Sequence, residues 1–388
     1  MQNVFRQKND FPIVMLICML LISHLAMLLS LSIGIVSLER LCSYIILFVS
    51  FGIYIYSYIR DPFVYKQDLI FIALVIYLIM LAVVYSWSYD DIVSILVFLS
   101  MLTTWRGARV INCNKMIEKL LLNLFSIQGL FLIALYFTPL AYKSYQEYVL
   151  VSSELTLGFS NPNQTGIILF FSLVILLILM SRCLISKARK IFLLTQIVAL
   201  SFLLILTDAR TSILSYLLFL FFFLKKKKVK IHSLISSAII VFPIVFVYLY
   251  DMLSKTVLSN VVFWGKKLFS GRQRVFEETL SMFDSKLFGN LSYFQFRNSH
   301  NALLTILVNI GVVGFILYLV FTIMSVNSLN RKCKINNNSI CIIAILMMFI
   351  MGCAETAVLT GGTIYYVFML VMLILSNNEL KKQEEAVS

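Results

Sequence analysis

The stretch RNSHNALLTILVNIGVVGFILYL, residues 297–319, places the tetrad Arg-Asn-Ser-His directly before a run of nearly uncharged residues. That run of about 19 residues is long enough to cross a bilayer as a helix. The last residue of the tetrad, His300, carries the side chain best suited to move protons near neutral pH. The stretch therefore predicts a membrane span with a chemically capable side chain at its end.

Composition extends this prediction to the whole chain of 388 residues, of which 61% are hydrophobic and 13% charged. Soluble domains carry roughly 25% charged residues. We therefore predict an all-α integral membrane protein with about twelve spans, or ten to eleven if the short fourth and eighth runs do not cross. The predicted helices are 12–36, 41–59, 69–87, 91–105, 117–139, 165–181, 191–207, 211–224, 231–250, 301–325, 339–354 and 360–376.

Basic residues predict the orientation, because they gather on the cytoplasmic side of membrane proteins. With both termini inside, most of the 32 Lys and Arg residues fall on the inner side. The net charge of +14 then reflects orientation against anionic lipid headgroups and gives no reason to invoke nucleic acid. We read the first apolar run as a retained helix, since it exceeds the apolar core of a secretory signal.

The chain reads as a single polytopic membrane domain, 1–388, with two long outer loops, 140–164 and 251–300. The second loop holds most of the outer cations and a predicted amphipathic helix from about Arg272 to Phe283. It contains no cysteine, so no disulfide framework is expected there. The three histidines lie far apart without ligand spacing, so no metal site and no cofactor are predicted.

Two outward features precede the large loop. In GFSNPNQTG, residues 158–166, Asn161 and Asn163 supply turn and capping chemistry, and the Asn163 amide is also suited to a sugar hydroxyl. In TDARTS, residues 207–212, Arg210 either pairs with Asp208 or offers its planar donor fork to phosphate oxygens.

Two further features lie in the large loop. In SGRQR, residues 270–274, Gly271 permits a sharp turn, and Arg272 and Arg274 open the predicted helix. Cations oppose the dipole there, so a bound anion would favour them, although Arg274 also fits a plain exposed charge. In the opening tetrad, Asn298 or Ser299 is expected to cap the tenth helix, a role that does not require His300.

At these residues the sequence resembles the family of O-antigen and capsular polysaccharide polymerases and O-antigen ligases. The similar elements are Asn-Pro-Asn at 161–163, Arg-Thr-Ser at 210–212, Gly271-Arg272, Phe288-Gly289-Asn290, His300-Asn301 and Gly-Val-Val-Gly at 311–314. They span roughly residues 155–325. Relatives often have two glycines where Phe288-Gly289-Asn290 has one.

The resemblance implies glycosyl transfer from an undecaprenyl-diphosphate-linked oligosaccharide at the outer face of a bacterial cytoplasmic membrane. Arg210 and Arg272 would hold the diphosphate, and His300 would position or deprotonate the acceptor hydroxyl. Arg274, Asn161, Asn163, Asn301, Arg297 and Glu277 would contact substrate. The arginines take the place of a metal, so the reaction is expected to be metal-independent. A chain-length regulator protein is an implied partner.

Three other functions remain open on the sequence. A ligase differs from a polymerase mainly in passing the glycan to a lipid core. A flippase or transporter for the same lipid-linked oligosaccharide would place polar groups near the membrane midplane, where His24 is the main exception among uncharged helix centres. A structural component of an assembly complex would leave His300 and the arginines without a chemical role. The polymerase is the favoured interpretation.

Overall fold

The computed structural model describes residues 11–111, 114–142, 154–159, 161–225, 231–256, 261–263, 266–267, 272–290, 294, 300–336, 340–360 and 365–376. Within these residues the regular elements are helices, apart from two short strands. The strands β1 (Val262–Phe263) and β2 (Lys266–Lys267) pair antiparallel in the loop that was predicted to be large. The fold is thus all-α, as predicted.

Nine helices in the described part of the chain are long and apolar enough to cross a membrane. Helices longer than about 18 apolar residues satisfy their backbone polar groups internally, which the bilayer demands. The protein is therefore a multi-pass helical membrane protein. The nine are α2 (Phe11–Ile33), α3 (Val36–Arg60), α4 (Lys66–Val84), α5 (Tyr89–Val110), α6 (Lys115–Tyr136), α7 (Pro162–Arg182), α8 (Lys187–Leu206), α10 (Ser233–Ser254) and α12 (Ala302–Asn336).

Three shorter apolar helices complete the predicted set of twelve runs. They are α9 (Arg210–Leu224), α13 (Ile340–Met351) and the helix Tyr365–Ser376. The remaining helices are η1 (Pro139–Tyr142), α11 (Arg272–Ser281) and α14 (Ala357–Thr360). Each predicted run overlaps a helix, and the predicted amphipathic helix corresponds to α11.

The fourth predicted run, 91–105, was short for a membrane span, and Arg106 follows it directly. In the structure α5 has 22 residues and continues to Val110. The Arg106 guanidinium is buried, donates to Ser57 Oγ and the Asp61 carbonyl, and lies 4.3 Å from the centre of the Tyr58 ring. These partners compensate the buried charge, so the helix does not end there.

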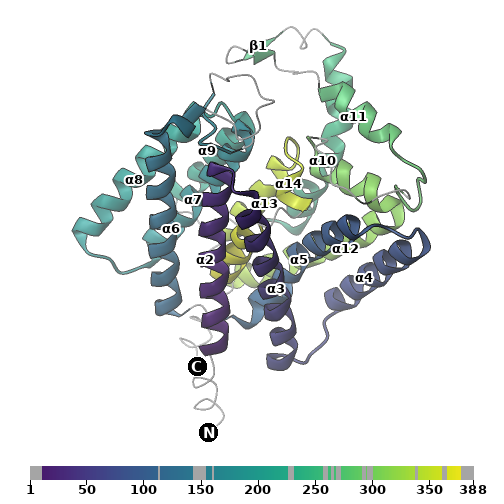
Figure 1. Cartoon of the computed structure of the whole chain (residues 1–388), viewed down its shortest axis with the longest axis horizontal. Helices are drawn as coiled ribbons and strands as arrows, with labels where there is room; N and C mark the ends of the chain where they lie inside the picture. The colour runs from purple at the N-terminus through teal and green to yellow at the C-terminus, as the bar shows by residue number, and fades with distance from the viewer. Residues whose placement is uncertain are drawn as a thin grey trace. The chain divides into compact units, whose positions relative to one another are not determined.

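The chain divides into two units, the first built from residues 1–62, 103–229 and 366–388. Within it α2, α6 and α7 pack together (Figure 1). The His24 Nε2 atom lies 3.2 Å from Gln128 Oε1, and Gln128 Nε2 donates to Ser172 Oγ at 2.8 Å. This buried polar chain joins the three helices, and it accounts for the histidine in an otherwise apolar helix centre.

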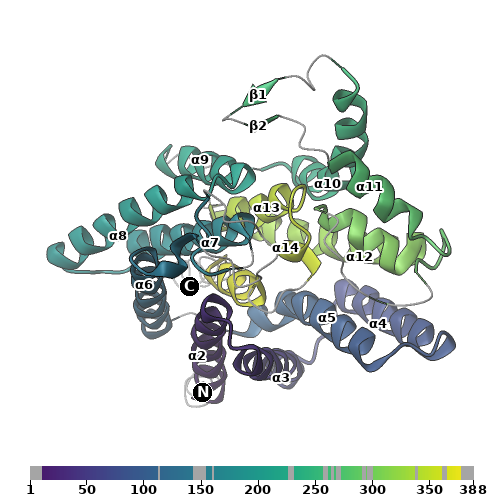
Figure 2. The ribbon, with the colours of Figure 1, turned by 45° about the horizontal axis from the view of Figure 1, so that its top comes forward.

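The second unit comprises residues 63–102 and 230–365. Figure 2 shows α4 and α12 side by side in this unit. Gln67 Nε2 donates to the Met324 carbonyl at 3.0 Å, and the Tyr77 hydroxyl donates to the Ile310 carbonyl at 2.8 Å. Since residue numbers rise along α4 as they fall along α12, the two helices run antiparallel.

The run 301–325 was predicted as one helix, but the structure breaks it at Gly311. That residue has φ 63° and ψ −177°, which are not helical angles. Segment 285–290 fills the break: Asn290 N donates to the Val308 carbonyl, and Val312 N donates to the Lys286 carbonyl. The two glycine motifs noted in the sequence, at 288–290 and 311–314, therefore meet each other.

Candidate functional site

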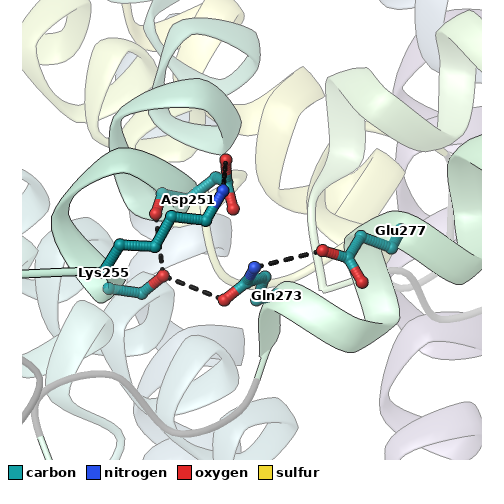
Figure 3. Close-up of polar contacts among 5 residues, drawn as sticks. Asp251, Lys255, Gln273 and Glu277 are labelled. Atoms are coloured by element: carbon teal, nitrogen blue, oxygen red, sulfur yellow. Dashed lines mark hydrogen bonds and ion pairs between the residues drawn. The ribbon is translucent and has the colours of Figure 1, made fainter.

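Polar contacts attach the start of α11 to the end of α10 (Figure 3). Ser254 Oγ donates to Gln273 Oε1 at 2.9 Å, and Gln273 Nε2 donates to Glu277 Oε1 at 3.1 Å. Lys255 Nζ contacts Asp251 Oδ2 at 2.8 Å one turn away. The first turn of α11, where Arg272 lies, is thus positioned by a neighbouring membrane helix.

Apolar contacts hold the other face of α11. Phe276 is buried among Val247 and Tyr250 of α10 and Leu304 and Val308 of α12. The rings of Phe276 and Tyr250 meet edge to face, with centroids 5.5 Å apart. A helix of 10 residues is marginal alone in water, so this packing is what keeps α11 formed.

His300 lies immediately before α12 in a left-handed backbone conformation, with φ 55°. This conformation is uncommon for residues other than glycine, although Asn, Asp and His adopt it more readily. The next residue, Asn301, is fully buried; its Oδ1 accepts from Leu304 N and its Nδ2 donates to the Pro243 carbonyl of α10. Asn301 therefore caps α12 and fixes the position of the neighbouring His300 backbone.

This assignment corrects the predicted cap. Asn298 and Ser299 lie outside the described residues, and the capping bond comes from Asn301 because the helix begins at Ala302. Both ends of the Asn301 amide are engaged within the protein. A direct contact between Asn301 and substrate stays a prediction.

Arg272 acts electrostatically on His300. Burial lowers the pKa of the half-buried imidazole, and the Arg272 guanidinium lowers it further. Arg272 also opposes the rise that burial causes in the pKa of the Cys353 thiol. One cation thus influences two groups, one before α12 and one after α13, and at neutral pH it favours the proton-accepting form of His300.

The turn after α13 is a part of this region that the sequence did not indicate. The Gly352 carbonyl accepts from Ala302 N at 2.8 Å, which attaches the turn to the first residue of α12. Three residues later the turn carries Glu355, whose side chain is buried. A buried carboxylate is costly and is commonly functional in membrane proteins. The sequence signal for this residue is an acidic side chain within the otherwise apolar stretch 340–376.

The remaining predicted residues of the large loop are more exposed. Arg274, whose side chain is 87% exposed, forms an ion pair with Glu278 at 2.7 Å, as its exposed-charge interpretation anticipated. Glu277 accepts a hydrogen bond from Gln273 and faces solvent. Arg297 and Gly271 lie outside the described residues. Substrate contacts of these residues stay predictions.

The first unit brings together the other two sequence features. Asn161 caps α7 by accepting from Gln164 N at 2.8 Å, and Asn163 lies half-buried in the first turn. A Cβ atom on Gly166 would stand 3.2 Å from Ser212 Oγ, so the start of α7 packs closely on the start of α9. The Asn-Pro-Asn and Arg-Thr-Ser elements are therefore neighbours.

Arg210 begins α9, and its Nε lies 3.9 Å from Asp208 Oδ1. The predicted ion pair is present, at the long end of the range for such contacts. Arg210 belongs to the first unit, whereas Arg272 and His300 belong to the second. Their joint action on one diphosphate stays a prediction.

The fold defines a multi-pass helical membrane protein, and the region around His300 is its candidate site. No protein-family model, curated protein or solved structure matches the chain. The family resemblance therefore remains a prediction carried by the residues quoted for it.

Proposed function

We propose that the protein is a polymerase of lipid-linked oligosaccharide repeat units, of the O-antigen or capsular kind, in a bacterial cytoplasmic membrane. The donor glycan is carried on undecaprenyl diphosphate and passes to a sugar hydroxyl of a second lipid-linked unit at the outer face. The observation that supports this proposal is the pair formed by Arg272 and His300. The Arg272 guanidinium acts electrostatically on an imidazole whose pKa is lowered, so a cation suited to an anion and a group suited to accept a proton belong to one region.

The proposed step is a single displacement. The acceptor hydroxyl gives its proton to His300 as its oxygen attacks the anomeric carbon of the donor. The bond from that carbon to the diphosphate oxygen breaks, and its electron pair leaves with undecaprenyl diphosphate. Arg272 and the N-terminus of α11 stabilise the charge that builds on the leaving diphosphate. Attack from the opposite face inverts the anomeric centre.

Asn301 acts as a positioning residue in this proposal. It binds Pro243 through one end of its amide and caps α12 through the other, so it holds His300 relative to α10. The contacts of Phe276 and Gln273 do the same for Arg272. Such support matters because catalytic groups must be held within a fraction of an ångström.

The test is the polysaccharide chain length on a gel, in a strain lacking the gene and complemented with native protein, His300→Ala or His300→Asn. Asparagine tolerates the left-handed backbone of His300 but cannot accept a proton at neutral pH, so it separates chemistry from folding. Native protein should restore a ladder. Both variants, present in the membrane at native levels, should leave only single repeat units.

A full ladder with His300→Asn would overturn the role of His300. Two phenotypes of the deletion strain would contradict the assignment of the protein as a polymerase. Full-length polymer that stays on its lipid carrier would point to a ligase, and repeat units retained on the inner face would point to a transporter.

A further inference from the structure

The depth of segment 285–290 in the membrane follows from its contact with the break in α12. Val312 N donates to the Lys286 carbonyl at 3.0 Å, and Val313 N donates to the Leu287 carbonyl at 3.2 Å. The tip of the segment is therefore attached to α12 at the level of residues 311–313, several residues inside the apolar span.

The depth of residues 311–313 in the membrane can be measured along helix α4. Its 19 residues extend about 28 Å, close to the thickness of the hydrocarbon core. Lys66 marks one end, and Tyr85 and Tyr89 follow the other, as aromatic residues do at membrane interfaces. The Tyr77 hydroxyl reaches the Ile310 carbonyl, and Val84 lies seven residues further along α4. The break in α12 thus lies about 10 Å below the Val84 end of the hydrocarbon core.

The backbone of the segment is suited to that depth. Ser285 and Gly289 exchange two backbone hydrogen bonds, Asn290 N donates to the Val308 carbonyl, and Phe288 N donates to Ser285 Oγ. Together with the bonds to Val312 and Val313, these contacts engage the N–H groups of residues 285 and 288–290 and the carbonyls of residues 285–287 and 289. Irregular backbone is tolerated inside a membrane only where its polar groups are satisfied in this way.

Two of the three side chains at the tip, those of Leu287 and Phe288, are apolar and exposed. Leu287 is 57% exposed and Phe288 41% exposed. They continue a row of exposed apolar residues along one face of α12, namely Val312, Val313, Ile316 and Val320. Because α12 is a membrane span, that face meets lipid, and the tip extends the same surface.

We infer that residues 285–290 form a re-entrant loop, whose tip inserts Leu287 and Phe288 among the lipid acyl chains of the leaflet where α4 ends at Val84. Lys286 is exposed and long enough to extend its ammonium towards the headgroups. The partner of this surface is the bilayer itself. The inference does not depend on the proposed glycosyl transfer.

The test uses tryptophan fluorescence of Phe288→Trp in proteoliposomes, with the wild-type emission of Trp87, Trp105 and Trp264 subtracted. Two matched variants define the extremes. Ile79→Trp places the indole on the exposed face of α4, and Glu278→Trp places it on the surface helix α11. Quenching is measured with acyl-chain-brominated phosphatidylcholine and with aqueous iodide.

We expect Phe288→Trp to match Ile79→Trp within about twofold in quenching by brominated lipid, and to resist iodide. Iodide quenching equal to that of Glu278→Trp would overturn the inference. Maleimide labelling in freeze–thawed vesicles provides a second readout. Leu287→Cys should react at least tenfold more slowly than Glu278→Cys, because its protection comes from lipid rather than protein. Equal labelling rates would also overturn it.

Discussion

Gly289 and Gly311 meet backbone to backbone: a Cβ atom on Gly289 would stand 2.5 Å from the Gly311 amide nitrogen. Both residues have positive φ, 87° and 63° respectively. Two chain segments far apart in sequence can approach this closely only because neither residue has a side chain.

Replacing Gly311 with alanine should therefore destabilise the protein by more than about 1 kcal/mol, from strain at positive φ and from the clash with segment 285–290. The control is Gly52→Ala in α3, where the nearest atom to a new Cβ is 4.0 Å away. That change should be neutral or stabilising by up to about 1 kcal/mol. Melting temperatures in detergent measure both, and equal values would contradict the prediction.

Arg272→Gln should raise the pKa of His300, because the guanidinium is one of the two causes that lower it. The neutral imidazole of native protein then persists to lower pH than that of the variant. Diethyl pyrocarbonate acylates only neutral imidazole, so the pH midpoint of acylation of the His300 peptide should move upward in Arg272→Gln.

Arg274→Gln is the matched control for this measurement. Arg274 lies two residues away, is largely exposed and is paired with Glu278, so its removal should leave the midpoint unchanged. An unmoved midpoint in Arg272→Gln, or an equal shift in both variants, would show that Arg272 does not act on His300.

Phe276→Ala should detach α11 from α10 and α12. Truncating a buried phenylalanine costs about 3–5 kcal/mol, more than a 10-residue helix can compensate alone. Limited trypsin digestion should then cleave after Arg272 or Arg274 much faster than in native protein. Leu280→Ala, on the exposed side of the same helix, should keep the native rate of cleavage. Faster cleavage in both variants would show that α11 is not held specifically by the packing of Phe276.

Glu355→Gln should reduce polymer formation by about tenfold or more while leaving the melting temperature near its native value. The change keeps the shape of the side chain and a hydrogen-bond acceptor but removes the carboxylate, and a buried carboxylate in a membrane protein is commonly functional, so the loss is expected in activity. Chain length on gels and membrane abundance are the two measurements. Glu277→Gln, at an exposed carboxylate, is the control, and an unchanged ladder with Glu355→Gln would make Glu355 a structural residue.

Activity of purified protein should persist in a chelator without any divalent cation, since arginine rather than a metal is proposed to neutralise the leaving diphosphate. The measurement is the release of undecaprenyl diphosphate in chelator. Loss of that release, followed by recovery on adding a divalent ion, would defeat the prediction.

The helices were predictable because a bilayer requires about 20 apolar residues per span, a requirement visible in any single stretch. Two helices differed from the prediction, and each difference depends on contacts between residues distant in sequence. Helix α5 passes through Arg106 because Asp61 and Ser57 satisfy its guanidinium. The break at Gly311 depends on segment 285–290, and glycine alone is common within membrane helices.

The candidate site was predictable in part for the same reason. His300 and Arg272 were identified from residue type and from their place beside apolar runs, and in the structure the Arg272 guanidinium lowers the pKa of His300. The cap was placed too early because the turn at His300 could not be seen in the sequence. Glu355 was missed because its closeness to α12 arises through the bond between Gly352 and Ala302.

The two hydrogen bonds between α4 and α12, at Gln67–Met324 and Tyr77–Ile310, fix the sliding register of these helices. A shift of one turn would break both bonds inside a medium that offers no replacement partners. In bilayers of different thickness the pair is therefore expected to tilt as one body rather than slide. The loop tip held at Gly311 would tilt with the pair. A mismatch between the protein and the bilayer thickness would therefore change the tilt at the start of α12, next to His300.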